Sequence, residues 1–89
     1  MVSRTTKAFR KLLDNLPEKI QRQAHTSYAR WETDHFHNSL QFKQVHPSKP
    51  YFSARVNDDY RALGFVKEDR ITWFWIGSHS EYDNLLKRL

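Results

Sequence analysis

The chain has 89 residues, with 15 Lys and Arg against 10 Asp and Glu, which gives a net charge of +5. This length predicts a single domain over residues 1–89 with a small core. The absence of cysteine excludes disulfide bridges, thiolate nucleophiles and cysteine-based zinc sites. The basic charge favours an acidic partner such as nucleic acid, although many small proteins are basic for solubility alone.

The sequence contains no targeting signal that we can identify. No apolar run approaches the roughly 20 residues that span a bilayer. The start, Met1-Val2-Ser3-Arg4, lacks the apolar stretch of a secretory signal. We therefore expect a cytoplasmic protein with no membrane partner.

The N-terminal part of the chain predicts two amphipathic helices. Pro17 interrupts the apolar pattern and suits the first turn of a second helix over about residues 17–34. The apolar residues at helical spacing are Phe9, Leu12, Leu13 and Leu16 in the first helix, and Ile20, Ala24, Tyr28 and Trp31 in the second. Helices joined by so short a connection predict an antiparallel hairpin.

The second half of the chain predicts a sheet. Strands are expected over residues 40–45, 51–56, 60–66 and 71–76, because short apolar or β-branched runs alternate there with turn residues. Their short connections predict an antiparallel meander. The last run is apolar at nearly every position, which indicates a strand covered on both faces or a face that awaits a partner. The predicted fold is α+β, with an N-terminal helical hairpin packed on a four-stranded antiparallel sheet.

Two arginines are candidates for binding phosphate. A three-residue loop at Asn57–Asp59 would place Arg55 opposite Arg61 on one face of the sheet. A phosphate between them would relieve their repulsion, because guanidinium groups bind phosphate through paired hydrogen bonds. Two alternatives remain: a two-residue loop would split the arginines between faces, or a nearby carboxylate such as Asp58 would neutralise them.

The segment after the last strand holds a candidate acid or base. Gly77 lets the chain leave the strand, and small polar residues then surround His79, with Tyr82 three residues later. Histidine is the most frequent general acid or base near neutral pH. The alternative is that His79 and Tyr82 only cap or pack a C-terminal turn.

The remaining histidines and tryptophans give weaker indications. No histidine has the spacing to carboxylates that a metal site needs, beyond a weak His35–His37 pair, so we predict no metal and no cofactor. Trp73 and Trp75 could stack on bases, but aromatic residues in strands usually pack. We expect at least one of them in the core.

The hairpin and the closing segment together resemble a known family. The run Ser53-Ala54-Arg55-Val56-Asn57-Asp58-Asp59-Tyr60-Arg61-Ala62-Leu63 looks like the hairpin of RelE/ParE superfamily toxins, in particular the YoeB-like ribosome-dependent ribonucleases. The closing Trp75-Ile76-Gly77-Ser78-His79-Ser80-Glu81-Tyr82 is similar to the last strand of that family. The family also implies a strand before the first helix, for which Met1–Arg4 leaves little room.

The resemblance implies a function and a set of site residues. It implies the RelE-like fold of microbial ribonucleases, a type II toxin and a metal-independent cut of mRNA in the ribosome that inhibits translation. Arg61 would stabilise charge on the phosphate, His79 would act as acid or base, and Tyr82 would orient the nucleotide or assist proton transfer.

Further RNA contacts and partners follow from the same resemblance. Lys43 and Arg55 would contact RNA phosphates, and His46 would substitute for a family carboxylate in proton transfer. A cognate antitoxin, the ribosome and mRNA are the implied partners. The alternatives are a non-enzymatic inhibitor of DNA gyrase, as in the ParE branch, and a catalytically inactive binding module of the same fold.

Overall fold

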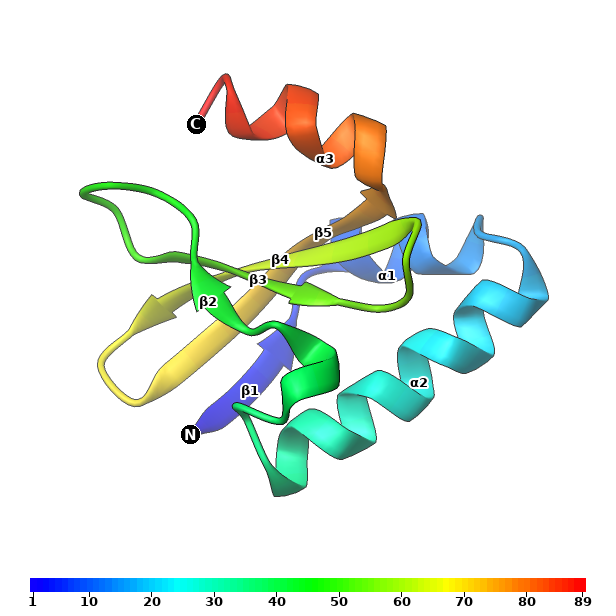
Figure 1. Cartoon of the computed structure of the whole chain (residues 1–89), viewed down its shortest axis with the longest axis horizontal. Helices are drawn as coiled ribbons and strands as arrows, with labels where there is room; N and C mark the ends of the chain where they lie inside the picture. The colour runs from blue at the N-terminus through cyan, green and yellow to red at the C-terminus, as the bar shows by residue number, and fades with distance from the viewer.

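The computed structural model describes residues 1–89 and contains one five-stranded sheet with helices on both of its faces (Figure 1). The α+β class and the two N-terminal helices match the expectation from sequence. The strand count does not, because the sheet gains a strand at the N-terminus. None of the helices combines the length and apolar character that crossing a bilayer requires.

The additional strand is β1 (Val2–Thr5), which pairs in parallel with β5 (Arg70–Ser78). The expectation of little strand before the first helix was therefore wrong. The four residues lack a clear apolar alternation, and their extended backbone is held by long-range pairing, as in Ser3 opposite Ile71. The sheet is consequently mixed, with the order β1-β5-β4-β3-β2.

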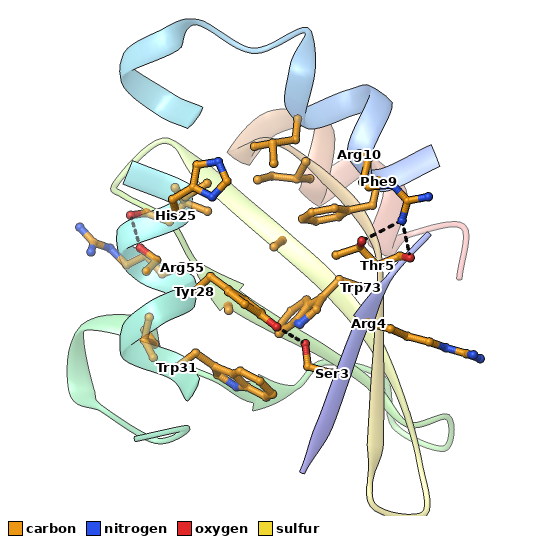
Figure 2. Close-up of a pocket in the computed structure, with 18 of the residues that line it drawn as sticks. Ser3, Arg4, Thr5, Phe9, Arg10, His25, Tyr28, Trp31, Arg55 and Trp73 are labelled. Atoms are coloured by element: carbon orange, nitrogen blue, oxygen red, sulfur yellow. Dashed lines mark hydrogen bonds between the residues drawn. The ribbon is translucent and has the colours of Figure 1, made fainter. Parts of the chain in front are cut away.

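Two helices follow β1 and cover one face of the sheet. The helix α1 (Lys7–Asp14) begins at Thr6, whose hydroxyl accepts a hydrogen bond from the Phe9 amide. The helix α2 (Glu18–Thr33) begins after Pro17, close to the predicted 17–34. The two helices diverge from their short connection and leave a groove between themselves and the sheet (Figure 2).

The other four strands lie close to their predicted ranges, with the exception of β2. The strand β3 (Tyr51–Arg55) and the strand β4 (Tyr60–Lys67) pair antiparallel, and β4 pairs antiparallel with β5. The expected strand over 40–45 is reduced to β2 (Lys43–Gln44), because a short 3-10 helix, η1 (Asn38–Leu40), occupies its first part. Gln41 ends η1 in a left-handed conformation.

An irregularity in β5 explains its nearly continuous apolar sequence. Gly64 pairs with Trp73 while Leu63 pairs with Trp75, so Phe74 is an extra residue and the alternation of faces is reset. Trp73 is therefore buried on the helical face, edge to face with Trp31 at 5.6 Å. Trp75 lies on the opposite face. Both faces of β5 are covered, as its sequence suggested.

The opposite face is covered by a third helix, α3 (His79–Leu86), where only a C-terminal turn was expected. Ser78 caps this helix: its hydroxyl accepts from the Glu81 amide, and the Glu81 carboxylate accepts from the Ser78 amide. Tyr82 of α3 packs near Trp75, with 6.5 Å between ring centroids. Leu63 is fully buried, although it lies outside the main core cluster. The sheet thus has a large core under α1 and α2 and a smaller one under α3.

Truncation of the main core should destabilise the fold strongly. Ile71 is 0% exposed in β5, so Ile71→Ala should lower the free energy of unfolding by about 2–5 kcal/mol. The control Val2→Ala, at a side chain that is 62% exposed, should change it by less than about 0.5 kcal/mol. Urea denaturation measures both values, and equal losses would contradict this packing.

Candidate functional site

A small polar cavity of about 130 Å³ lies beside the N-terminal end of α3. Its walls come from β2, β3, β4, α3 and the residue that follows η1, so it depends on the tertiary fold and not on one segment. The seven residues that line it are Gln41, Lys43, Ser53, Arg55, Arg61, His79 and Tyr82. Five of the six residues proposed from sequence are therefore brought together in one place.

The two arginines lie side by side on the sheet. Arg55 of β3 pairs with Arg61 of β4 in the register that the three-residue loop predicted. Arg55 forms a salt bridge with Asp58 in the intervening turn and donates to the Ser39 carbonyl at 3.3 Å. The alternative that Asp58 neutralises the arginines is therefore correct for Arg55.

Arg61 is held differently and has no carboxylate partner. Its Nη1 donates to the backbone carbonyls of Asn57 at 2.6 Å and Tyr60 at 2.9 Å. Neutral carbonyl groups fix the position of the guanidinium without cancelling its charge. Arg61 consequently lines the cavity without a salt bridge, although its charge adds to that of Arg55 in lowering the pKa of Asp58.

His79 is the first residue of α3 and is partly exposed. Its amide donates to the Asp59 carbonyl at 2.7 Å, which ties the start of α3 to the β3–β4 turn. Its Nε2 lies 3.4 Å from the Asp83 carboxylate one turn later, and 46% of its side chain is exposed. The imidazole is thus accessible to a substrate and has a carboxylate beside it.

Tyr82 forms the floor of the cavity under the helix. It is buried, its ring lies 5.7 Å from that of His79, and its hydroxyl makes no hydrogen bond within the chain. Gly77 permits this arrangement, because a Cβ at that position would lie 2.5 Å from the Trp75 ring on which Tyr82 packs.

His46 does not join this cavity. Its Nδ1 accepts hydrogen bonds from the amides of Ser48 at 3.1 Å and Lys49 at 2.9 Å, and its Nε2 lies 3.2 Å from the Leu89 carbonyl. The ring therefore organises the β2–β3 loop and attaches the C-terminus to it. The prediction that His46 belongs to the site is not supported by its position.

Sequence reasoning missed three residues of the site. Gln41 and Ser53 line the cavity, and Asp83 contacts His79. Ser53 could have been found from strand alternation, because it lies two residues before Arg55 and shares its face. Gln41 gives no comparable signal, since its position depends on η1. The structure contains no cluster of three His, Asp or Glu side chains that could hold a metal ion.

A second, larger cavity of about 560 Å³ lies between the two N-terminal helices and the sheet (Figure 2). Its walls are mostly apolar and include Phe9, Tyr28, Trp31 and Trp73. Figure 2 shows Arg10 held at its edge by Thr5, to which Nη1 donates at 2.9 and 3.0 Å. This groove is on the opposite face of the sheet from the polar cavity, and Arg55 lines both.

The Arg55–Asp58 pair gives a prediction for pH. The hydrogen bond from Arg55 and its charge lower the pKa of Asp58 below the usual value. The pair therefore stabilises the fold above the pKa of Asp58 in the unfolded chain, and this contribution is lost as pH falls through the lower folded pKa.

Carboxyl chemical shifts measured by nuclear magnetic resonance against pH will test this. Arg55→Gln should return the pKa of Asp58 towards its usual value. Arg22→Gln, which removes the partner of Glu18 instead, should leave the pKa of Asp58 unchanged. No difference between the wild type and Arg55→Gln would contradict the pair.

Comparison with known proteins identifies the family. The family of the ParE-like toxin domain matches residues 18–84, which is most of the chain. No curated protein matches the sequence.

Solved structures show the same fold. A chain of the RelB-RelE antitoxin-toxin complex from Methanococcus jannaschii has a TM-score of 0.72 at 17% identity, over 91% of this chain and 95% of that one. The YoeB/ParE toxin from Agrobacterium tumefaciens has a TM-score of 0.69 at 12% identity, over 89% of this chain and 99% of that one. A chain of the RelE-RelB complex from Pyrococcus horikoshii OT3 has a TM-score of 0.67 at 17% identity, over 86% of this chain and 92% of that one. The chain belongs to the ParE-like toxin domain family, within the RelE/ParE superfamily of toxins.

Proposed function

We propose that this chain is the toxin of a type II toxin–antitoxin system, and that it cleaves mRNA in the ribosome without a metal ion. One observation carries the proposal: Arg61 lies without a carboxylate partner in the same small cavity as His79 and Tyr82. Lys43 and Arg55 line the same cavity and add positive charge for the RNA backbone.

The cavity holds the groups that phosphodiester cleavage by a 2′-hydroxyl needs. The 2′-oxygen loses its proton and bonds to phosphorus, the bond from phosphorus to the 5′-oxygen breaks, and that oxygen takes up a proton. Arg61 stabilises the negative charge that develops on the phosphoryl oxygens. His79 carries out one proton transfer, with Asp83 beside its Nε2 to orient the ring.

Tyr82 is the second group within reach of the reacting atoms. Its unpaired hydroxyl can donate to the phosphate or assist the other proton transfer, and its ring lies 5.7 Å from that of His79. His46 takes no part, because its ring nitrogens contact the β2–β3 loop and the C-terminus. The reaction balances with no group beyond the substrate and these side chains.

A second candidate function is inhibition of DNA gyrase without catalysis. The observation that favours it is the family itself, which is described as ParE-like. A gyrase inhibitor of this fold would not need Arg61, His79 and Tyr82 to lie together. Their proximity in one cavity is the reason for placing the ribonuclease first.

The proposed antitoxin partner fits the apolar groove. Two of the structurally similar proteins were solved as complexes of RelE with RelB. In this chain the groove presents Phe9, Tyr28 and Trp73, with the basic Arg10 at its edge. An antitoxin segment with apolar side chains and flanking carboxylates would complement both features.

Substitution of the proposed catalytic groups should abolish toxicity. Arg61→Ala should lower the rate of mRNA cleavage by about 10²–10³, and His79→Gln by about 10²–10⁴. The control Lys19→Ala, on the exposed side of α2, should retain growth arrest. The measurements are growth after induction and cleavage of a reporter mRNA in a purified translation system.

The same assay separates the two candidate functions. Circular dichroism and antitoxin binding first establish that each variant is folded. Growth arrest that persists in a folded Arg61→Ala, His79→Gln double variant, together with broken DNA and intact mRNA, would reject the ribonuclease and support gyrase inhibition.

The groove gives a prediction for the partner. Co-expression with the protein encoded beside this gene should yield a complex whose melting temperature exceeds that of the free toxin, because a ligand bound only to the folded state stabilises it. Tyr28→Ala should weaken this complex by removing a groove wall, whereas Phe36→Ala, at a side chain that is 69% exposed outside the groove, should not. Equal effects of the two variants would contradict the groove as the binding site.

A further inference from the structure

A row of side chains crosses the sheet on the same face as Arg61, but farther along the strands. Phe65 lies four residues after Arg61 on β4, so the two side chains share a face about 13 Å apart. The strand register places Tyr51 of β3 on one side of Phe65. It places Thr72 of β5, and beyond it Arg4 of β1, on the other side. None of the residues that line the polar cavity belongs to this row.

The aromatic part of the row forms a partly open surface. The Tyr51 ring lies 5.4 Å from that of Phe65 and 5.8 Å from that of Phe74, which the irregularity of β5 turns to this face. Tyr51 and Phe74 are half-buried, whereas Phe65 is 36% exposed. Phe65 therefore presents part of its ring to solvent on a base of two packed rings.

Three cations lie beside this surface. Lys67 follows Phe65 by two residues on β4, and Arg70 lies opposite Lys67 on β5, so both share the face. Arg4 donates through Nε to the Thr72 hydroxyl at 3.2 Å, and Figure 2 shows its side chain directed away from the apolar groove. These three cations and Phe65 form the outer patch.

The cations of the outer patch have no carboxylate partners. The adjoining β4–β5 turn carries Glu68 and Asp69, but neither forms a salt bridge with any of the three cations. Asp69 lies 3.8 Å from the Met1 amine instead. Like charges that gather on one face without partners favour an acidic ligand.

We propose that the outer patch binds unpaired ribosomal RNA, as a contact separate from the strand that is cleaved. An exposed aromatic ring on a sheet offers a base a stacking surface, and the cations beside it bind phosphates. An acidic protein segment would meet the cations with its carboxylates but would leave the Phe65 ring uncovered. The exposed ring therefore favours RNA over protein as the ligand.

The position of α3 indicates that the ligand is a second strand. Trp75 lies on this face between Phe65 and Arg61, and Tyr82 of α3 packs near it. A strand in the polar cavity would have to cross α3 to reach the outer patch. In a protein that acts in the ribosome, the second strand is the RNA of the ribosome itself. This inference rests on the proposed function, which supplies the ribosome as the partner.

Binding to purified ribosomes that carry no mRNA tests the outer patch, because no substrate strand is then present. Phe65→Leu keeps an apolar side chain but removes the ring. It should weaken binding, measured by sedimentation, by at least about fivefold, the lower end for the loss of one stacked base. Phe36→Leu, at a phenylalanine that is 69% exposed outside the patch, should leave the dissociation constant unchanged.

The cations give a second measurement. Lys67→Gln should reduce the slope of log affinity against log salt concentration by about 0.7–0.9, because the loss of one phosphate contact releases fewer counterions. The control Lys19→Gln, at an exposed position of α2, should not change this slope. Circular dichroism first establishes that each variant is folded.

The outcomes distinguish the outer patch from the ribonuclease. Arg61→Ala should abolish cleavage and still bind empty ribosomes, whereas Phe65→Leu should lose this binding. Equal binding by Phe65→Leu and Phe36→Leu would overturn the patch, whatever the protein cleaves. Loss of binding in Phe65→Leu would support the patch even in a protein that cleaves nothing, and only the proposed function would then fail.

Two further results would reject ribosomal RNA as the ligand. Polyglutamate is an anion without bases, and hexauridylate is a short unpaired RNA. Equal competition by both for ribosome binding would make the outer patch a site for acidic protein. An effect of Phe65→Leu that appears only when mRNA is present would assign the contact to the mRNA.

Discussion

The register between β3 and β4 is the constraint on which the site depends. It pairs Arg55 with Arg61 on one face of the sheet, and a slip of one residue would send their side chains to opposite faces. The turn between the strands fixes this register: the Asn57 side chain accepts from the Asp59 amide at 2.8 Å, and the Val56 amide donates to the Tyr60 carbonyl. The same turn supplies Asp58 to Arg55 and the Asn57 carbonyl to Arg61. A single hairpin thus sets both the positions and the charge balance of the two guanidinium groups.

The start of α3 is attached to this hairpin, which couples His79, the proposed acid–base group, to Arg61, the proposed phosphate-binding group. The Asp59 carbonyl accepts from the His79 amide, and the Ser78–Glu81 capping box fixes the direction in which the helix leaves the strand. Below it, Tyr82 packs near Trp75 in the space that Gly77 leaves free. The larger core on the other face carries most of the apolar burial and forms the groove. The fold therefore separates a polar face suited to chemistry from an apolar face suited to a protein partner.

Much of this arrangement could be predicted from the sequence, and the failures have physical reasons. The β3–β4 hairpin and the helices have strong local signals: apolar periodicity, Pro17 and a polar turn. The strand β1 could not be recognised, because it is held by parallel pairing with a strand about 70 residues away and has no clear apolar alternation. The helix α3 had a signal that was overlooked, since Ser78 and Glu81 have the spacing of a capping box.

In the site, too, residues within local sequence motifs could be predicted, whereas residues placed by the tertiary fold could not. Residues of the hairpin and of the closing segment could be proposed because their spacing resembles a family pattern. His46 was proposed as a substitute for a family carboxylate that this sequence lacks, and the structure places it in the β2–β3 loop outside the cavity. Gln41 was missed because its place on the cavity wall follows from η1 and a left-handed backbone, which a propensity argument does not predict.

The most direct test of the central claim is the chemistry of the cleaved ends. RNA cut through its own 2′-hydroxyl leaves a 2′,3′-cyclic phosphate and a 5′-hydroxyl, and a single 2′-deoxy nucleotide at the cut position prevents the reaction. Mass spectrometry of mRNA fragments from purified ribosomes and toxin should show these ends, and none from the 2′-deoxy substrate. Fragments with a 3′-hydroxyl and a 5′-phosphate, or cleavage that persists at the 2′-deoxy position, would contradict the account.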